Sequence, residues 1–316
     1  MIPFNKPYIS GNEFKYMRDA FERGQLAGDG KYTKICSELL EKHINTNKAL
    51  LTHSCTAAIE MAAILLNIRE GDEFITPSYT FVSTVNPFIL RGGIPKFVDI
   101  RKDTLNIDEN LIEKEINHRT RAIVLVHYAG VSCDMGKIMK IAKAYNLPVV
   151  EDAAHAISSK YKDKPLGSLG SFGTLSFHET KNIISGEGGA LLVNDEKYIE
   201  RAEIIREKGT NRKKFLRGTI DKYSWVDIGS SYLPGELISA FLFGQLENLE
   251  SINKLRMSIW EKYYNSFSEL VLKGIIQIPF VPSYCEHNGH LFYIILPTKE
   301  IRDRFISHMK AKGINC

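Results

Sequence analysis

The chain has 316 residues, of which 44% are hydrophobic and 25% charged, and this composition is typical of a soluble globular protein. Its 41 basic and 37 acidic residues leave a net charge of only +4, so charge does not indicate a nucleic-acid-binding protein. The longest apolar stretch, Ala57–Leu66, is too short to cross a bilayer and contains Glu60. The first residues lack the basic and apolar regions of a signal peptide. Five dispersed cysteines without a CxxC pair predict neither a disulfide framework nor a metal site, and they favour the cytoplasm.

Short apolar runs alternate with amphipathic stretches as far as Val193. We predict strands at Lys48–Leu51, Glu73–Thr76, Lys96–Ile100, Ala122–His127, Pro148–Glu151, Thr174–Phe177 and Ala190–Val193. Helices are expected between most of them, at Ala57–Leu66, Val82–Leu90, Glu109–Glu115 and Lys137–Ala144. This alternation predicts an α/β fold with a mostly parallel, seven-stranded type of sheet that carries helices on both faces.

The pattern changes after Val193. A helix is predicted at Glu196–Lys208, a long helical region at about Glu236–Leu272, a strand at Phe292–Leu296 and a helix at Ile301–Lys312. We therefore expect a large domain over residues 1–240, and a connector helix with a smaller C-terminal α+β domain over residues 241–316. The sequence stops just after a helix and a glycine, where α/β folds usually begin another strand, so the small domain is expected to be truncated.

In open parallel sheets, ligands bind at the carboxyl ends of the strands, so we consider the residues that follow each predicted strand. The first strand is followed by HSCTAA, in which Ser54 can cap a helix while Cys55 and Thr56 occupy its first turn. Free N–H groups and the helix dipole favour a phosphate there, although a plain serine cap is the commoner explanation of the motif by itself. Tyr79 follows the second strand, where it could stack on a flat cofactor or belong to the core.

Two further strand ends carry ionisable side chains. Asp152, in EDAAH, needs a positive partner if it is buried, and a protonated pyridine nitrogen or a salt bridge would serve. His155 could lie in the core or bond a cofactor's phenolic oxygen. Lys181, in SFHETKN, precedes a glycine-rich turn at Gly186–Gly189. A partly desolvated lysine becomes nucleophilic, whereas a surface lysine is the simpler alternative.

The order of these features is more informative than any one of them. A helix start, an aromatic residue, a strand-end aspartate and a lysine before a glycine-rich turn together indicate a pyridoxal 5'-phosphate (PLP) site. No GxGxxG follows a strand, GSLGSFG has the wrong spacing for a dinucleotide, and GxxxxGK[ST] is absent. The sequence therefore lacks the motifs of nicotinamide-dependent and nucleotide-hydrolysing enzymes.

Several segments resemble a known family in the same order along the chain: HSCTAAIEMAA, PSYTFVST, VHYAGV, EDAAH, SFHETKN, GEGGA, ERAEIIREKGTNR and DKYSWVDIGSSYL. The chain resembles the DegT/DnrJ/StrS sugar aminotransferases, which are fold-type I PLP enzymes, from Met1 to Cys316. The resemblance implies that Lys181 carries the cofactor as a Schiff base, that Asp152 binds the pyridine nitrogen and that Tyr79 stacks on the ring. It also implies a phosphate site made by Cys55, Thr56 and Ser176.

Two positions depart from the commonest family pattern. His155 stands where many members have glutamine, and both side chains can donate to the phenolic oxygen. Ser231 stands where many members have an asparagine that reaches the phosphate of the partner subunit, and this implies a homodimer. Family members usually continue beyond the equivalent of Cys316, with the rest of the small domain and part of the sugar site.

The resemblance also implies an activity. The expected reaction moves the amino group of L-glutamate to a nucleotide-linked keto-sugar, most closely dTDP-4-dehydro-6-deoxy-D-glucose, with neither nucleic acid nor membrane as a partner. Arg206, Lys208 and Arg212 are candidates for contacts with the diphosphate, or else lie on a solvated face. The alternatives are a dehydratase, against which Lys181 argues, another keto-sugar acceptor, and an inactive, truncated cofactor-binding fragment.

Overall fold

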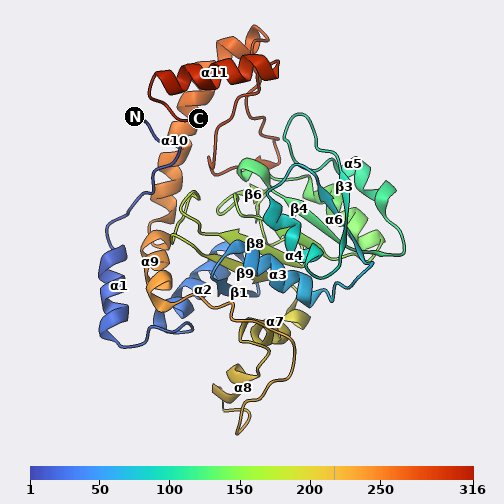
Figure 1. Cartoon of the computed structure of the whole chain (residues 1–316), viewed down its shortest axis with the longest axis vertical. Helices are drawn as coiled ribbons and strands as arrows, with labels where there is room; N and C mark the ends of the chain where they lie inside the picture. The colour runs from blue at the N-terminus through green and yellow to red at the C-terminus, as the bar shows by residue number, and fades with distance from the viewer. Residues whose placement is uncertain (217) are drawn as a thin grey trace.

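The apolar runs up to Val193 form one seven-stranded sheet in the computed structural model, which describes residues 1–216 and 218–316 (Figure 1). The strands are β1 (Lys48–Thr52), β2 (Glu73–Pro77), β3 (Ile94–Val98), β4 (Thr120–Val126), β5 (Val149–Asp152), β8 (Phe172–Ser176) and β9 (Gly189–Val193). Their order is β1-β9-β8-β5-β4-β2-β3. β9 runs antiparallel to both of its neighbours, and the other pairs are parallel. The predicted mostly parallel sheet is therefore confirmed.

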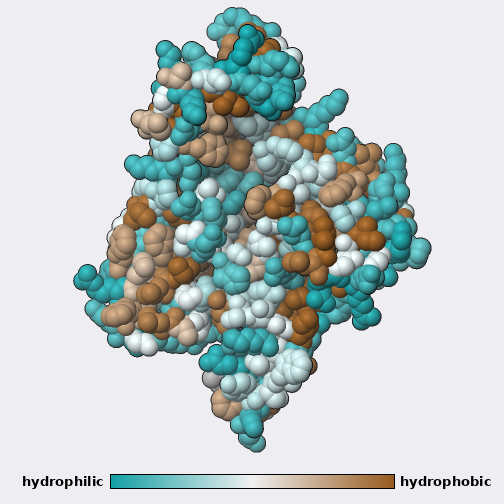
Figure 2. Space-filling model, in the orientation of Figure 1, coloured by the Kyte–Doolittle hydropathy of each residue, from teal (hydrophilic) through white to brown (hydrophobic). Residues whose placement is uncertain are grey.

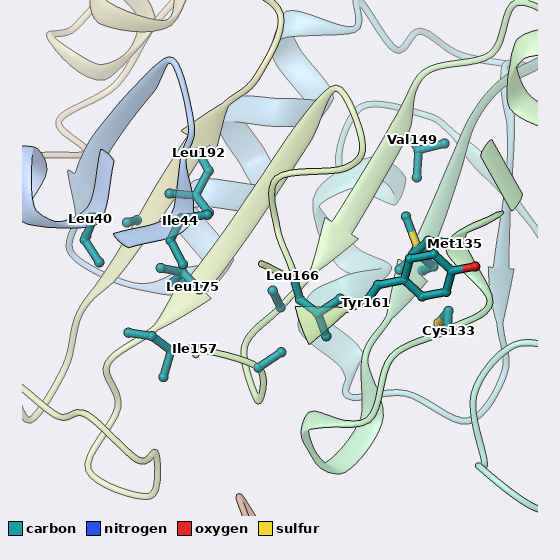
Figure 3. Close-up of a cluster of buried hydrophobic side chains, with 14 of the residues drawn as sticks. Leu40, Ile44, Cys133, Met135, Val149, Ile157, Tyr161, Leu166, Leu175 and Leu192 are labelled. Atoms are coloured by element: carbon teal, nitrogen blue, oxygen red, sulfur yellow. The ribbon is translucent and has the colours of Figure 1, made fainter. Parts of the chain in front are cut away.

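Two hydrophobic clusters cover the two faces of the sheet. One includes residues of α3 (Cys55–Leu65), α4 (Asn86–Ile89) and α7 (Ile199–Arg206). The other includes residues of α2 (Lys31–Ile44), α5 (Glu109–Ile112), α6 (Met135–Ala144) and α9 (Glu236–Leu246), and Figure 3 shows part of it. Along β4, Ile123 and Leu125 belong to one cluster while Ala122 and Val124 belong to the other. Successive side chains of a strand point to opposite faces, so this strand is buried on both sides, as its continuous apolar sequence requires.

The first 47 residues carry two helices for which the sequence patterns gave no prediction. α1 (Glu13–Glu22) packs against α9, and α2 leads into β1. The buried carboxylate of Glu236 accepts hydrogen bonds from the N–H groups of Gly30 (3.0 Å), Tyr32 (2.9 Å) and Thr33 (3.1 Å) at the start of α2. A residue about two hundred positions later therefore caps this helix.

The predicted helical region Glu236–Leu272 is wrong in one respect, because it consists of α9 and α10 (Leu249–Leu272) with a break at Glu247 and Asn248. The Asn248 side chain donates to the carbonyl of Gly244 at 3.0 Å, and the Ser10 hydroxyl donates to the same oxygen at 2.8 Å. That carbonyl would otherwise accept the N–H four residues on, so the side chains replace the helical bond.

Three other predictions of secondary structure need correction. Phe292–Leu296 is not a strand, because only Ile295 forms a bridge, with Gln277. Val82–Leu90 divides into the 3-10 turn η1 (Val82–Thr84) and α4, since Pro87 has no N–H with which to continue a helix from η1. Glu196–Lys208 begins as the 3-10 turn η4 (Glu196–Tyr198), and its α-helix, α7, ends at Arg206.

The remaining elements are short or lie near the C-terminus. They are η2 (Glu113–Glu115), η3 (Tyr128–Gly130), β6 (Lys160–Tyr161), β7 (Lys164–Pro165), α8 (Arg212–Leu216), β10 (Cys285–Glu286) and α11 (Lys299–Ala311). β10 pairs with β6, which ties the chain after α10 to the segment after β5. The two ends of the chain lie together (Figure 1), and the N–H of Ile2 donates to the carbonyl of Gly313 at 2.7 Å. Within the described ranges, every helix is too short or too polar to cross a membrane.

Candidate active site

A cavity of about 700 Å³ lies at the carboxyl ends of β2, β4, β5 and β8, against the first turn of α3. Its walls contain seven of the eight residues predicted from the sequence: Cys55, Thr56, Tyr79, Asp152, His155, Ser176 and Lys181. These positions span 127 residues of sequence but share one edge of the sheet, as parallel strands require.

The first turn of α3 gives the cavity a region rich in hydrogen-bond donors. Ser54 is the N-cap, and its hydroxyl accepts the N–H of Ala57 at 3.1 Å. Cys55 and Thr56 are the first helical residues, so their N–H groups have no partner within the helix. The Thr56 hydroxyl donates to that of Ser83 at 2.8 Å. Burial raises the pKa of the Cys55 thiol, so the thiol stays neutral beside a bound anion.

The glycine-rich turn packs directly against this helix start. A Cβ at Gly189 would overlap the Ser54 carbonyl group and the backbone nitrogen of Cys55. Only a residue without a side chain lets β9 pass this closely. Glycine at position 189 is therefore required for β9 to pack against the donor-rich first turn of α3.

Asp152, at the end of β5, is 5% exposed. One of its oxygens accepts the Thr84 hydroxyl at 2.7 Å and the other accepts the N–H of Ala154 at 3.1 Å. Burial raises the pKa of this carboxyl group, while these hydrogen bonds and the charge of Lys181 oppose the rise. The side chain is held rigidly by neutral donors, and its charge is available to a cationic group in the cavity.

Lys181 lies in the turn after β8, where its N–H donates to the carbonyl of His178 at 2.9 Å. Burial lowers the pKa of its amine, and the negative charge of Asp152 partly offsets this effect. A larger fraction of the amine is therefore unprotonated than in a surface lysine, and the unprotonated amine is the nucleophile.

His155 is held in a defined tautomer. Its Nδ1 accepts the N–H of Ala129 at 3.3 Å. Burial and the nearby charge of Lys181 lower its pKa to about 3, so the ring is neutral at physiological pH. Because Nδ1 accepts, the ring proton is on Nε2, and Nε2–H is the only donor that the ring offers to the cavity.

Three tyrosine or phenylalanine rings line the cavity, those of Tyr79, Phe81 and Tyr128. Tyr79 is 44% exposed, and its hydroxyl donates to that of Tyr128 at 3.1 Å, with the rings edge-on at 5.1 Å. Phe81 is 74% exposed, also lines the cavity and makes no ring contact with the aromatic residues that the structure describes. It lies three residues before Thr84, the partner of Asp152. The sequence analysis gave no prediction for Phe81, although the motif PSYTF contains both Tyr79 and Phe81.

GSLGSFG proves to be a structural turn. The buried carboxylate of Glu151 accepts the N–H groups of Gly167 (2.9 Å), Leu169 (2.7 Å) and Gly170 (2.6 Å). It also contacts His127 Nε2 at 2.9 Å. The first acidic residue of EDAAH therefore anchors a loop, and the second faces the cavity.

Four predicted residues lie outside the walls of the cavity. Ser231 is exposed and bridges Glu207. Arg206 is 1% exposed and donates to Asp29 and to the carbonyl of Leu51. Lys208 and Arg212 pair with Glu207 at 3.0 and 3.2 Å. Within this chain, the prediction that Arg206 contacts a diphosphate is therefore wrong, because its guanidinium group is used in the interior.

The pattern of the DegT/DnrJ/EryC1/StrS aminotransferase family matches residues 7–316. The chain belongs to this family. A protein of Methanocaldococcus jannaschii, itself uncharacterised, is 34% identical to this aminotransferase over 99% of the chain and 82% of its own length. The spore coat polysaccharide biosynthesis protein SpsC of Bacillus subtilis is 33% identical over 95% and 77%.

Solved structures agree with the family. Spr1654 of Streptococcus pneumoniae is assigned as a sugar aminotransferase. Its structure with pyridoxamine 5'-phosphate (PMP) superposes with a TM-score of 0.92 and 26% identity, over 100% of this chain and 84% of the other. Its PLP form gives a TM-score of 0.90. The aminotransferase TlmJ of Streptoalloteichus hindustanus gives 0.91 at 25% identity, over 100% and 84%. The chain is thus a PLP-dependent aminotransferase with the fold-type I architecture, as its sequence predicted.

The residues of the cavity fit this cofactor. The start of α3 offers N–H and hydroxyl donors for a phosphate, Asp152 offers a buried carboxylate for a ring nitrogen and Lys181 offers a partly desolvated amine. No group of three or more potential metal ligands occurs within residues 1–216 and 218–316.

Proposed function

We propose that this aminotransferase moves the amino group of L-glutamate to C4 of dTDP-4-dehydro-6-deoxy-D-glucose. The products are dTDP-4-amino-4,6-dideoxy-D-galactose and 2-oxoglutarate, and the pathway is cytoplasmic synthesis of a cell-surface polysaccharide such as enterobacterial common antigen or O-antigen. The observation that carries the proposal is the meeting of Lys181, Asp152 and the start of α3 in one cavity. The polysaccharide role of the relative SpsC supports the pathway.

Lys181 holds the cofactor covalently in the resting enzyme. When free, its amine would act as a general base that takes a proton from the α-carbon of the amino donor. Its lowered pKa suits this exchange, because the amine must be unprotonated to accept the proton. PLP, when bound, supplies an electron sink for the carbanion that this removal generates. In the reaction with the sugar, the same amine, once protonated, would act as a general acid that delivers a proton to C4 of the sugar.

Asp152 keeps the ring nitrogen protonated, which maintains the electron sink. Its contacts with Thr84 and Ala154 orient the carboxylate before the cofactor arrives. Cys55, Thr56 and Ser176 hold the phosphate with the first turn of α3, and His155 donates through Nε2–H to the phenolic oxygen. Tyr79 and Phe81 are both candidates for stacking on the cofactor ring. Phe81 is the better placed, because the edge-on contact with Tyr128 restrains Tyr79.

We further propose a homodimer in which Ser231 reaches the phosphate of the partner's site. Apolar patches lie over α1 and α9 in Figure 2, where Phe14 and Phe21 are 68% and 67% exposed. The chain around α8 projects from the body (Figure 1) and carries Trp225, which is 80% exposed. Exposed aromatic residues of this kind are typical of interfaces. A monomer with full activity in sedimentation and turnover measurements would contradict the dimer.

The proposed division into domains places the cofactor residues in residues 1–240, and residues 241–316 contribute the connector helix and a smaller C-terminal unit. All seven cavity residues predicted from the sequence lie between Cys55 and Lys181, which supports this division. Limited proteolysis with mass spectrometry would test it, since a first cleavage within the large unit would contradict the boundary.

The deciding experiment treats the PLP-loaded enzyme with glutamate, then with the keto-sugar, and determines the configuration of the product at C4 by NMR. Glutamate should convert PLP to PMP, and the sugar should restore PLP with release of the galacto product. A gluco product or turnover with another keto-sugar would correct the substrate. Conversion without glutamate, or none with any acceptor, would refute the reaction. Lys160→Ala is a matched control, because this lysine is paired with Glu286 outside the cavity.

A further inference from the structure

The loop Asn288–His290, which follows β10, contacts the backbone of the cavity residue His155. The Asn288 amide donates to the carbonyl of His155 at 2.8 Å and to that of Ile157 at 2.9 Å. A Cβ at Gly130 would overlap the Asn288 side-chain oxygen, so η3 also passes close to this loop. Asn288 is 2% exposed and absent from the cavity walls. The loop therefore holds the segment after β5 from outside the cavity.

His290 holds the ring of His155. The two imidazoles stack with centroids 4.2 Å apart and planes 25° apart. His290 is 9% exposed, and its Nδ1 lies 2.9 Å from the side-chain oxygen of Asn182. Asn182 in turn donates to the carbonyl of Asn288 at 2.9 Å. The residue immediately after Lys181 thus fixes the plane of the ring against which His155 stacks.

Arg256, on α10, joins the same two segments. Its guanidinium donates to the carbonyl of Lys181 at 3.3 Å and to that of His290 at 3.2 Å. No salt bridge connects it to a carboxylate within residues 1–216 and 218–316. Burying a cation without an acidic partner is costly unless its N–H donors are hydrogen-bonded. The hydrogen bonds from Arg256 therefore restrain the backbone carbonyls of Lys181 and His290.

We propose that His290, Asn288 and Arg256 are positioning residues that hold the Nε2–H of His155 and the backbone of Lys181 in place for the cofactor. The proposal rests on the roles proposed above for His155 and Lys181. Truncating His290 frees the imidazole of His155 to rotate, which weakens its hydrogen bond to the phenolic oxygen. That oxygen then attracts the proton of the Schiff base more strongly. The pKa of the Schiff base, measured from the absorbance of the bound cofactor, should therefore rise.

The titratable and charged groups that face the two histidines are Lys181, Arg256 and Tyr128. They are unchanged in a His290 variant. Both rings are neutral, since burial lowers the pKa of His290 well below its usual value, as it does that of His155. A change in the Schiff-base titration therefore reports the orientation of His155 rather than the loss of a charge.

The experiment titrates the cofactor absorbance against pH in wild type, His290→Ala, His290→Phe and His287→Ala. We expect His290→Ala to raise the pKa of the Schiff base by about one unit, or about 1.4 kcal/mol. His290→Phe keeps a flat ring against His155 and should give a smaller rise; it carries the test if the alanine variant folds poorly. His287 is the matched control. It immediately precedes the loop, packs on Trp260 with ring centroids 4.3 Å apart and accepts the N–H of Gly289 at 3.2 Å. Because its ring contacts Trp260 and Gly289 and does not stack on His155, its truncation should leave the titration unchanged.

A double-mutant cycle separates positioning from a general structural effect. In a His155→Ala background, His290→Ala should no longer shift the titration, because there is no imidazole left to orient. A shift that persists there, or wild-type titrations in both His290 variants, would overturn the proposal. If the proposed function is wrong, the result is different. The wild type itself then shows no cofactor absorbance band that titrates with pH, and no band that is lost when Lys181 is replaced.

Discussion

Replacing Asp152 with asparagine removes the charge of the carboxylate and keeps its shape. The amide oxygen can still accept the N–H of Ala154, and the Thr84 hydroxyl can rotate to accept from the amide nitrogen. What is lost is the ion pair with the protonated ring nitrogen of PLP. Removing one partner of a buried pair costs about 3–5 kcal/mol, and each 1.36 kcal/mol is a factor of ten in rate. We therefore expect turnover to fall by roughly 10² to 10⁴-fold.

The same substitution should have the opposite effect on the cofactor-free protein. Burial raises the folded-state pKa of Asp152 above its usual value, so the folded state favours the protonated carboxyl group. That favourable contribution is present below the unfolded pKa and is lost as pH rises through the folded one. At neutral pH the wild-type apoprotein therefore carries an unfavourable buried charge, which asparagine removes. The variant apoprotein should be at least as stable as wild type at pH 7, and the difference should shrink toward pH 4.

Two measurements test this reasoning. Single-turnover conversion of PLP to PMP by glutamate gives the rate, and urea unfolding of the apoprotein at several pH values gives the stability. Near-normal conversion would remove Asp152 from the proposed role. A large loss of apoprotein stability at pH 7 would show that the carboxylate is needed for folding, and the drop in rate could not then be attributed to the ring nitrogen. Glu286→Gln, which neutralises an exposed carboxylate outside the cavity, is the control.

Three further substitutions have definite expected outcomes. Lys181→Ala should abolish borohydride-fixed cofactor and both half-reactions, and normal turnover of this variant would invalidate the site. Thr56→Val keeps the volume but removes a hydroxyl that can rotate away from Ser83 to donate to the phosphate. The dissociation constant of PLP should therefore rise roughly 10- to 100-fold, for a hydrogen bond of about 1.5–3 kcal/mol to a charged group; unchanged affinity in a fluorescence titration would place the phosphate elsewhere. Gly189→Ala forces a Cβ against the Ser54–Cys55 backbone and should cost about 1–3 kcal/mol of stability together with cofactor affinity. At Gly235 the nearest atom to an added Cβ is 3.5 Å away, so Gly235→Ala should lose only the small preference of an N-cap for glycine over alanine. Equal thermal midpoints for the two variants would refute the close approach at Gly189.

The sequence alone was enough to predict the sheet and most of the cavity. Runs such as Thr120–Val126 are apolar at every position after Arg121, which a strand covered on both faces requires. The residues that follow such strands must meet at one edge when the strands are parallel. The predicted positions Asp152 and Lys181 depend only on this rule and on the local order of strand, turn and helix.

Contacts between distant segments decided the rest. Asn248 ends α9 because its side chain and that of Ser10 take a helical carbonyl, and no periodicity within the helix reveals this. Phe81 and Tyr79 are both aromatic in one motif, and only the contact of Tyr79 with Tyr128 distinguishes them. Asn288 bonds the carbonyl of a residue 133 positions earlier. Local sequence patterns record the burial of a face and the start of a helix, but the partner of a side chain depends on how the whole chain folds back on itself.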